Sequence, residues 1–284
     1  MRAVWSIWLL VGACTLPDIR DCPCAEGWIC RAPEMRCVRG MADDASIDAD
    51  LDADLDAGPS GPVAHWTCDA LDGTTMRDET GNEHDARCDA AGCPMLVDDP
   101  ERGRVCLFGP GETSAPRLRV SHDDDFVSDA FTVALWAHPA GTNSGSAIGK
   151  PYAAGRANSW QMFFVRSDGQ LLARFVSAVC PAPEDDCPSV GGETITGLAG
   201  TPVATDAWVH FTIVWDGSTQ IAYVDGVETE SQPGDIDFDT RDITIGADDN
   251  GGEVDLPFPG MLDDIRIYDR ALTPEEIAAL AGMG

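Results

Sequence analysis

The chain has 284 residues, of which 49 are acidic and 18 basic, and its formal net charge at pH 7 is -31. This balance argues against nucleic acid as a partner, because neutralising phosphates takes clustered lysine and arginine, and Lys150 is the single lysine of the sequence. The length is enough for one large β domain with small appendages, or for two modest domains, and with 44% hydrophobic residues the chain can bury a core.

Residues 1–13 are predicted to be an export signal, with a positive start, a short apolar run and then small residues. The run from Ala3 to Ala13 is much shorter than the ~20 residues that cross a bilayer, so a permanent transmembrane helix is the weaker interpretation. The residues up to Cys14 resemble a bacterial lipobox, in which the signal is cut just before a cysteine that becomes lipidated. The alternative is an ordinary cleaved signal with an incidental cysteine.

The number of cysteines supports the lipid anchor. With Cys14 as the anchor, ten of the 11 cysteines remain, and they can pair completely. Four lie in a short segment and six in the larger region: Cys22, Cys24, Cys30 and Cys37, then Cys68, Cys88, Cys93, Cys106, Cys180 and Cys187. Disulfides predict an oxidising compartment, which we take to be a bacterial cell envelope with the anchor in the outer membrane. Zinc is the competing use of these thiols, but the sequence has no CxxC…CxxC spacing.

Two small regions precede the main domain. Residues 14–40 form a cysteine-rich stub that is too small to fold without disulfides. Residues 41–62 form an acidic linker with seven aspartates between Asp43 and Asp56, and its charges predict an extended, solvated chain that holds the main domain away from the membrane. A calcium-binding repeat is the alternative, but the linker lacks the regular glycines that such a repeat needs.

Residues 63–284 have the pattern of an antiparallel, all-β domain. Apolar and other residues alternate along 131–136 and along 208–215, and Asp-Gly pairs such as Asp225-Gly226 mark hairpin turns between such runs. One helix is expected over residues 273–280, where Thr273 can cap, Pro274 occupies the first turn and Glu276 completes a capping box.

Four stretches of this region, in order and spacing, resemble the laminin-G-like, concanavalin A-like jelly-roll domains of bacterial surface proteins. They are residues 64–82, 131–136, 208–226 and 260–277. The resemblance implies two antiparallel sheets packed face to face, and in most members a role in binding carbohydrate or protein. It says more about fold than about function, since this fold is also used by glycosidases.

The resemblance also implies one structural Ca²⁺ where the start and the end of the domain meet. The matching positions are Asp69, Asp78, Asn82 and Asp263. Carboxylate and amide oxygens suit this ion. The alternative is that they are solvated turn residues, since Asp78 and the Gly-Asn pair that follows it form a good turn without any ion.

A ligand site is predicted in a loop that combines aromatic rings with hydrogen-bond donors, at Tyr152, Arg156, Asn158 and Trp160. The alternative is that these are turn and core residues. For the disulfides, closeness in sequence favours Cys88–Cys93 and Cys180–Cys187, which leaves Cys68 and Cys106 to tie two neighbouring strands. Fifteen pairings of six cysteines stay possible.

The sequence predicts no catalytic residue. Glycosidases of this fold carry a Glu-x-Asp-x-x-Glu pattern, and here Glu253 and Asp255 are followed by Phe258 in place of the last carboxylate. The histidines have no HExxH spacing and no GxSxG neighbour, and His210 is expected to have a structural role. We therefore predict a lipoprotein with a binding domain for carbohydrate or protein and not an enzyme. The alternatives are a structural envelope protein without a ligand and a divergent glycan hydrolase.

Overall fold

The computed structural model describes residues 28–31, 36–39, 61–88, 92–109, 116–141, 144–151, 158–179, 194–238, 240–250 and 252–282. The chain divides into two units, residues 1–59 and 60–284. In the first unit, β1 (Trp28–Arg31) pairs antiparallel with β2 (Arg36–Arg39). Among the residues described, there is no helix of the length and apolarity that spanning a membrane requires.

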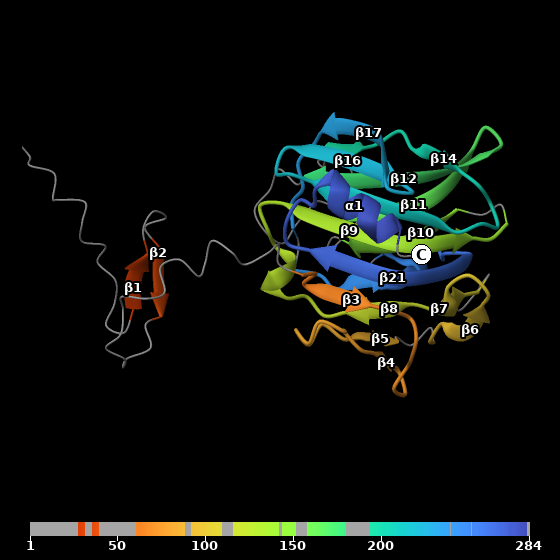
Figure 1. Cartoon of the computed structure of the whole chain (residues 1–284), viewed down its shortest axis with the longest axis horizontal. Helices are drawn as coiled ribbons and strands as arrows, with labels where there is room; N and C mark the ends of the chain where they lie inside the picture. The colour runs from red at the N-terminus through yellow and green to blue at the C-terminus, as the bar shows by residue number, and fades with distance from the viewer. Residues whose placement is uncertain are drawn as a thin grey trace, which may run out of the picture. The chain divides into compact units, whose positions relative to one another are not determined.

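The second unit contains two large antiparallel sheets (Figure 1): the alternating patterns predict antiparallel strands, and the resemblance implies the two sheets. The nine-stranded sheet has the order β13-β12-β11-β10-β18-β8-β5-β4, with β14 beside β12. Its strands are β4 (Thr75–Met76), β5 (Ala86–Cys88), β8 (Leu118–Val120), β10 (Gly145–Pro151), β11 (Asn158–Ser167), β12 (Gln170–Val179), β13 (Thr194–Gly197), β14 (Thr201–Val203) and β18 (Ile243–Ile245).

The eight-stranded sheet has the order β17-β16-β15-β9-β21-β7-β6, and β3 also pairs with β21. Its strands are β3 (Ala64–Trp66), β6 (Met95–Asp99), β7 (Gly103–Phe108), β9 (Phe131–Pro139), β15 (Val209–Trp215), β16 (Thr219–Val224), β17 (Val227–Pro233) and β21 (Gly260–Tyr268). A separate hairpin pairs β19 (Asp248–Asn250) with β20 (Glu253–Asp255).

The core lies between the two sheets. Along β11, Trp160 and Phe164 point inward and are buried. The Trp160 ring lies 5.6 Å from Phe131 of β9, and the Phe164 ring lies 6.0 Å from Phe211 of β15. Met162 shares this inward face. Since successive side chains of a strand point to opposite faces, Gln161 and Phe163 lie on the outer face of the nine-stranded sheet.

The first and last strands of the domain meet. β3 pairs with β21 with Trp66 opposite Ile265, and β7 pairs with an earlier part of β21. Both therefore lie along the same edge of β21, one after the other. A disulfide joins Cys68, just after β3, to Cys106 of β7, so it links two strands that lie end to end and not side by side. The resemblance implies that the start and the end of the domain meet in this way.

The structure also contains the short-loop disulfide Cys88–Cys93, whose Cα atoms lie 4.9 Å apart. This pair and Cys68–Cys106 are the pairs that the sequence favours. The predicted pair Cys180–Cys187 lies outside the described residues.

The predicted terminal helix is α1 (Pro274–Ala281), which lies across the outer face of the eight-stranded sheet (Figure 1). Its buried residues Ile277 and Leu280 pack with Tyr223 and Tyr268 of that sheet in a second, smaller core. Thr273 accepts a hydrogen bond from the backbone of Glu276, whose carboxylate accepts one from the backbone of Thr273, which completes the capping box.

Replacing this cap should destabilise the helix. We expect Thr273→Ala to lower the free energy of unfolding by about 1 kcal/mol, because the side-chain acceptor of the first helical turn is lost. Thr273→Ser keeps the acceptor and should leave the stability close to that of the wild type. Urea titrations followed by circular dichroism would compare the two; equal losses for both variants would contradict the role of the hydroxyl.

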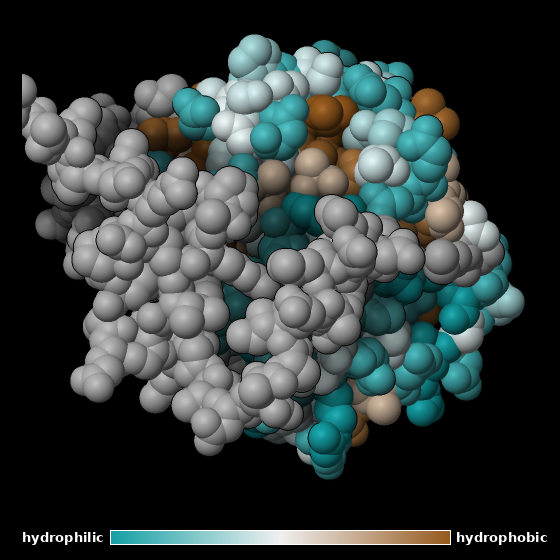
Figure 2. Space-filling model, turned by 60° about the vertical axis from the view of Figure 1, so that its left-hand side comes forward, coloured by the Kyte–Doolittle hydropathy of each residue, from teal (hydrophilic) through white to brown (hydrophobic). Residues whose placement is uncertain are grey.

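The described surface is mostly hydrophilic on the side of the molecule shown in Figure 2, where hydrophobic residues appear as separate patches. The large exposed hydrophobic residues lie on different elements of the domain: Met95, Val127, Ile195 and Val227. Scattered apolar residues of this kind are normal on a monomer surface and do not mark an interaction site.

Candidate binding site

Of the four residues predicted to bind calcium, Asp78 is fully engaged by its own chain. Its carboxylate accepts hydrogen bonds from the hydroxyl of Thr80 at 2.6 Å and from the backbone of His65, Thr80 and His84. Burial raises the pKa of Asp78, but these hydrogen bonds together hold it below its ordinary value. Asp78 thus organises the turn after β4, but as a buried residue and not as the solvated one of the alternative interpretation.

Among the described residues, the carboxylates of Asp69, Asp78 and Asp263 do not form a group at metal-ligand spacing. Asp263 is buried on the outer face of the eight-stranded sheet and pairs with Arg102 at 2.7 Å, so an arginine neutralises its charge. Asp69 is exposed, and the side-chain amide of Asn82 donates to the backbone carbonyl of Val63 at 2.9 Å. The residues predicted from the resemblance therefore have protein partners or face solvent.

A different group of possible metal ligands occurs among the described residues. One ligand atom from each of His84, Asp123 and Asp125 lies within 4.8 Å of the others. His84 is buried, and its Nε2 lies 3.2 Å from Asp125 Oδ2. Calcium prefers oxygen ligands, so an imidazole in the set fits it poorly and suits a transition metal better.

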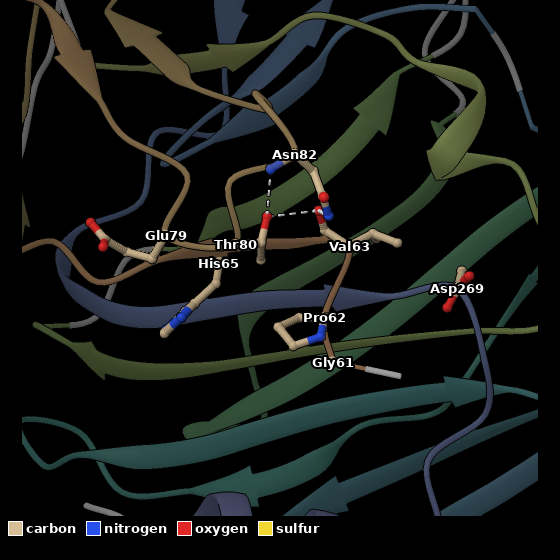
Figure 3. Close-up of a pocket in the computed structure, with 8 residues that line it drawn as sticks. All are labelled: Gly61, Pro62, Val63, His65, Glu79, Thr80, Asn82 and Asp269. Atoms are coloured by element: carbon tan, nitrogen blue, oxygen red, sulfur yellow. Dashed lines mark hydrogen bonds between the residues drawn. The ribbon is translucent and has the colours of Figure 1, made fainter. Parts of the chain in front are cut away.

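Two surface pockets lie near the start of the domain. The larger, of about 520 Å³, is shown in Figure 3; its lining residues are Gly61, Pro62, Val63, His65, Glu79, Thr80, Asn82 and Asp269. Figure 3 shows that Thr80 and Asn82 both point toward the carbonyl of Val63, while Glu79 and Asp269 lie on opposite sides. A smaller pocket of about 240 Å³ lies beside it, lined by residues that include Leu71. Among the described residues, neither pocket is lined by a Trp, Tyr or Phe ring on which a sugar could stack.

The predicted ligand loop is divided by the structure. Tyr152 and Arg156 lie outside the described residues, whereas Asn158 and Trp160 belong to β11. Trp160 is 2% exposed and packs against Phe131 in the core, so its prediction as a ligand platform is wrong. It occupies an inward position of the strand, and its neighbour Gln161 occupies an outward one. Asn158 does contribute to a polar site, as described next.

A row of paired residues crosses the outer face of the nine-stranded sheet. Strand register places Arg87 beside Arg119, Arg119 beside Thr244, Thr244 beside Gly149, and Gly149 beside Gln161. A Cβ atom placed on Gly149 would lie only 3.2 Å from the Cγ of Gln161. The glutamine side chain therefore lies over the glycine, in the middle of the face.

Asp248, from the β19–β20 hairpin, lies next to this row. Its carboxylate accepts a hydrogen bond from the side-chain amide of Asn158 at 3.1 Å and one from the backbone of Asp249 at 2.8 Å. Burial raises its pKa above the ordinary value, with Asp255 adding repulsion. The Gln161 amide is close enough to Asp248 to lower its pKa, but its buried Nε2 makes no hydrogen bond of normal geometry to the described residues.

The neighbouring Asp249 is held by two arginines. Arg119 donates to its carboxylate, and Arg117 lies 3.6 Å from the same oxygen and donates to the Asp248 carbonyl at 3.1 Å. Burial raises the pKa of Asp249, but the hydrogen bonds from Gly252 and Arg119 and the charges of the two arginines lower it overall. We call this set the outer polar cluster: Arg117, Arg119, Asn158, Gln161, Asp248 and Asp249.

An aromatic ring lies on the same face, two residues along β11 from Gln161. Phe163 is half-buried, and Arg174 of β12, its partner in the register, places its guanidinium 5.6 Å from the ring centroid. Two residues along a strand correspond to about 7 Å, which is the scale of one sugar ring. The face therefore offers an aromatic surface next to amide and carboxylate groups.

The outer face of the eight-stranded sheet has a second buried polar group, which is structural. The Arg102 guanidinium lies 4.3 Å from the ring centre of Trp136 and 5.5 Å from that of Trp208, while its Nε donates to Asp263. Trp208 donates to Asp99, in the turn that carries Arg102. These contacts fix the β6–β7 turn against the sheet.

Two antiparallel sheets packed face to face, with the first and last strands paired, define the class as a jelly-roll β-sandwich. The chain belongs to the concanavalin A-like lectin/glucanase superfamily: the family model of that description matches residues 112–278, more than half of the chain. No curated protein matches the sequence significantly.

Solved structures with the same fold include several binding domains. One is domain 4 of AbnA, an extracellular arabinanase from Geobacillus stearothermophilus, in complex with arabinotriose, at 20% identity and a TM-score of 0.52, covering 78% of this chain and 98% of that one. Another is the binding domain of Paraclostridial Mosquitocidal Protein 1, at 17% identity and a TM-score of 0.54, covering 78% and 52%. A third is the binding domain of botulinum neurotoxin DC in complex with SialylT. It has 13% identity and a TM-score of 0.52, and the match covers 78% of this chain and 51% of that one. The chain spans about half the length of the second and third of these.

Proposed function

We propose that the domain binds carbohydrate at the outer polar cluster and does not cleave it. The observation that carries the proposal is the buried Gln161 amide beside a desolvated Asp248 carboxylate: Gln161 is 4% exposed, and among the described residues its Nε2 has no hydrogen-bond partner of normal geometry. Buried polar groups in folded proteins are nearly always hydrogen-bonded, and leaving one without a partner costs about 1–3 kcal/mol. A bound hydroxyl group would supply what the amide lacks.

Sugars match this site chemically. A sugar hydroxyl both donates and accepts, so it can donate to the Asp248 carboxylate and accept from an amide such as Gln161. The Phe163 ring offers an apolar surface for the sugar face. The domain of AbnA in complex with arabinotriose supports a carbohydrate ligand, since it has the same fold and is matched over nearly all of its length.

The rest of the chain would present this domain at the cell envelope. In this proposal Cys14 carries the lipid anchor, and the aspartate-rich tract of residues 41–62 is a self-repelling tether. The alternative is a structural envelope protein with no ligand, and this alternative does not explain the buried amide of Gln161.

Binding can be tested with the purified full chain on a glycan array. We expect glycans to be retained by the wild type, and the strongest of them to bind Gln161→Ala about tenfold more weakly, because an amide hydrogen bond and its buried contact are lost. Glu79→Ala, in the pocket of Figure 3, is the matched control and should bind like the wild type.

Three results would contradict the proposal. An array without any bound glycan would favour the structural alternative. Loss of glycan binding in Glu79→Ala alone would show that the binding site is the pocket of Figure 3. Release of reducing ends from a bound polysaccharide would show that the domain is a hydrolase and not a binding domain.

A further inference from the structure

His84 is held in a fixed position beside two aspartates. Its backbone N–H donates to Asp78, and its carbonyl accepts from the indole of Trp66 at 2.9 Å. Its ring packs against the ring of Phe126, with the centroids 4.6 Å apart. The side chain is 6% exposed, and among the described residues the ring hydrogen-bonds only to the carboxylate of Asp125, 3.2 Å from Nε2. A buried imidazole is therefore aimed at this carboxylate.

The two carboxylates come from the segment between β8 and β9. Asp123 accepts a hydrogen bond from the backbone of Asp125 at 3.0 Å, and both side chains are exposed on their outer side. Unlike Asp249 and Asp263, neither forms an ion pair with an arginine or lysine of the described chain. The group thus has buried protein on one side, water on the other, and two carboxylates that no such cation neutralises.

The spacing of the three groups suits a divalent first-row metal ion. Nitrogen and oxygen ligands lie about 2.0–2.2 Å from such an ion, which places tetrahedral ligands about 3.4 Å apart. His84 Nε2 and Asp125 Oδ2 are 3.2 Å apart, and an oxygen of Asp123 lies within 4.8 Å of both. Rotation of the exposed Asp123 side chain would close this gap, and water would complete the shell. One imidazole and two carboxylates serve Ca²⁺ poorly, since it takes six to eight oxygen ligands.

We propose that His84, Asp123 and Asp125 form a site for a divalent transition-metal ion such as Zn²⁺. The neutral imidazole binds through Nε2 and keeps its proton on Nδ1, while the two carboxylates balance the charge of the ion. The ion joins the segment before β5 to the segment before β9, across 41 residues of sequence. The site shares no residue with the outer polar cluster, so this inference is independent of the proposed function.

The test is isothermal titration of the full chain, with its disulfides oxidised, using Zn²⁺ and Ca²⁺. Acidic residues elsewhere, including those of residues 41–62, attract any divalent cation, so two variants of equal charge are compared. Asp125→Asn removes a ligand, whereas Asp124→Asn removes the neighbouring carboxylate, which is fully exposed and lies outside the group. We expect the tightest Zn²⁺ site to be weakened at least about tenfold in Asp125→Asn and to be unchanged in Asp124→Asn.

Two further measurements identify the ion and the imidazole. An excess of Ca²⁺ of about a hundredfold should leave the tightest Zn²⁺ site occupied. Zn²⁺ should raise the Tm of the wild type and of Asp124→Asn by a few degrees, and that of Asp125→Asn much less, because the ion binds the folded chain. His84→Gln should lose the same site; if thermal melts show that this buried substitution unfolds the domain, Asp123→Asn replaces it.

Four results would overturn the proposal. Absence of Zn²⁺ binding would leave His84 and Asp125 as an ordinary hydrogen-bonded pair. Equal weakening in Asp125→Asn and Asp124→Asn would reduce the effect to general attraction by negative charge. Zn²⁺ binding that neither Asp125→Asn nor the second ligand variant changes would place the ion elsewhere on the chain. Displacement of Zn²⁺ by Ca²⁺ would show a site of oxygen ligands without the imidazole.

Discussion

Removing the Cys68–Cys106 disulfide in the double variant Cys68→Ala/Cys106→Ala should lower the free energy of unfolding by about 4 kcal/mol. The cysteines are 38 residues apart in sequence, and the cross-link of such a loop restricts the unfolded chain by roughly this amount in the chain-entropy model. Both cysteines are fully buried, so the substitutions also remove core contacts. Urea unfolding without reductant would measure the loss.

The shorter disulfide provides the control. Cys88 and Cys93 are only five residues apart, so Cys88→Ala/Cys93→Ala should cost about 2 kcal/mol in the same model. A loss at Cys88–Cys93 that equals or exceeds the loss at Cys68–Cys106 would show that chain entropy does not govern these bridges.

Acid should destabilise the domain through His210. This histidine is 2% exposed, and its pKa is lowered from 6.5 to about 4, mainly by burial; Asp264 opposes this shift, and Arg102 and Arg266 add to it. The folded state then prefers the neutral ring. The stability this gives is complete above pH 6.5 and is lost as the pH falls toward 4. Relative to His210→Gln, the wild type should lose about 2 kcal/mol of unfolding free energy between pH 7.5 and 4.5.

The comparison with His210→Gln isolates this effect from that of Asp263, which has the opposite sign. Burial raises the pKa of Asp263 to about 6 although Arg102 pulls it down, so the folded state binds an extra proton between pH 3.8 and 6 and gains stability as the pH falls through that range. Urea titrations of both proteins at the two pH values would measure the difference. A difference independent of pH, or an NMR titration of His210 with a midpoint near 6.5, would contradict the prediction.

Alternation and turn chemistry were enough to predict antiparallel strands, the terminal helix and its cap, whereas the two-sheet packing came from the resemblance. Phe131, Val133 and Leu135 all face the core as their spacing predicts, and Thr273 caps α1. These features are local, since each depends on residues a few positions apart. The favoured pairing Cys88–Cys93 was accessible for the same reason.

The candidate site was harder to predict because it depends on strands far apart in sequence. Asp248 meets Asn158 across 90 residues and Arg119 meets Asp249 across 130, and no local pattern records either contact. Trp160 was misplaced because β11 carries large apolar residues on both faces, with Phe163 outward and Trp160 inward. The face of the strand could have been inferred from Gln161, whose polarity marks the outward positions.

The end-to-end arrangement of β3 and β7 along β21 has a mechanical consequence for a tethered domain. Tension applied through residue 61 would peel β3 from β21, since Val63 donates to the Ile267 carbonyl at the point where the domain begins. Peeling could proceed only as far as Cys68, where the bond to Cys106 would pass the load directly to β7. The covalent link thus limits how much chain can be drawn out before the whole sandwich must rupture.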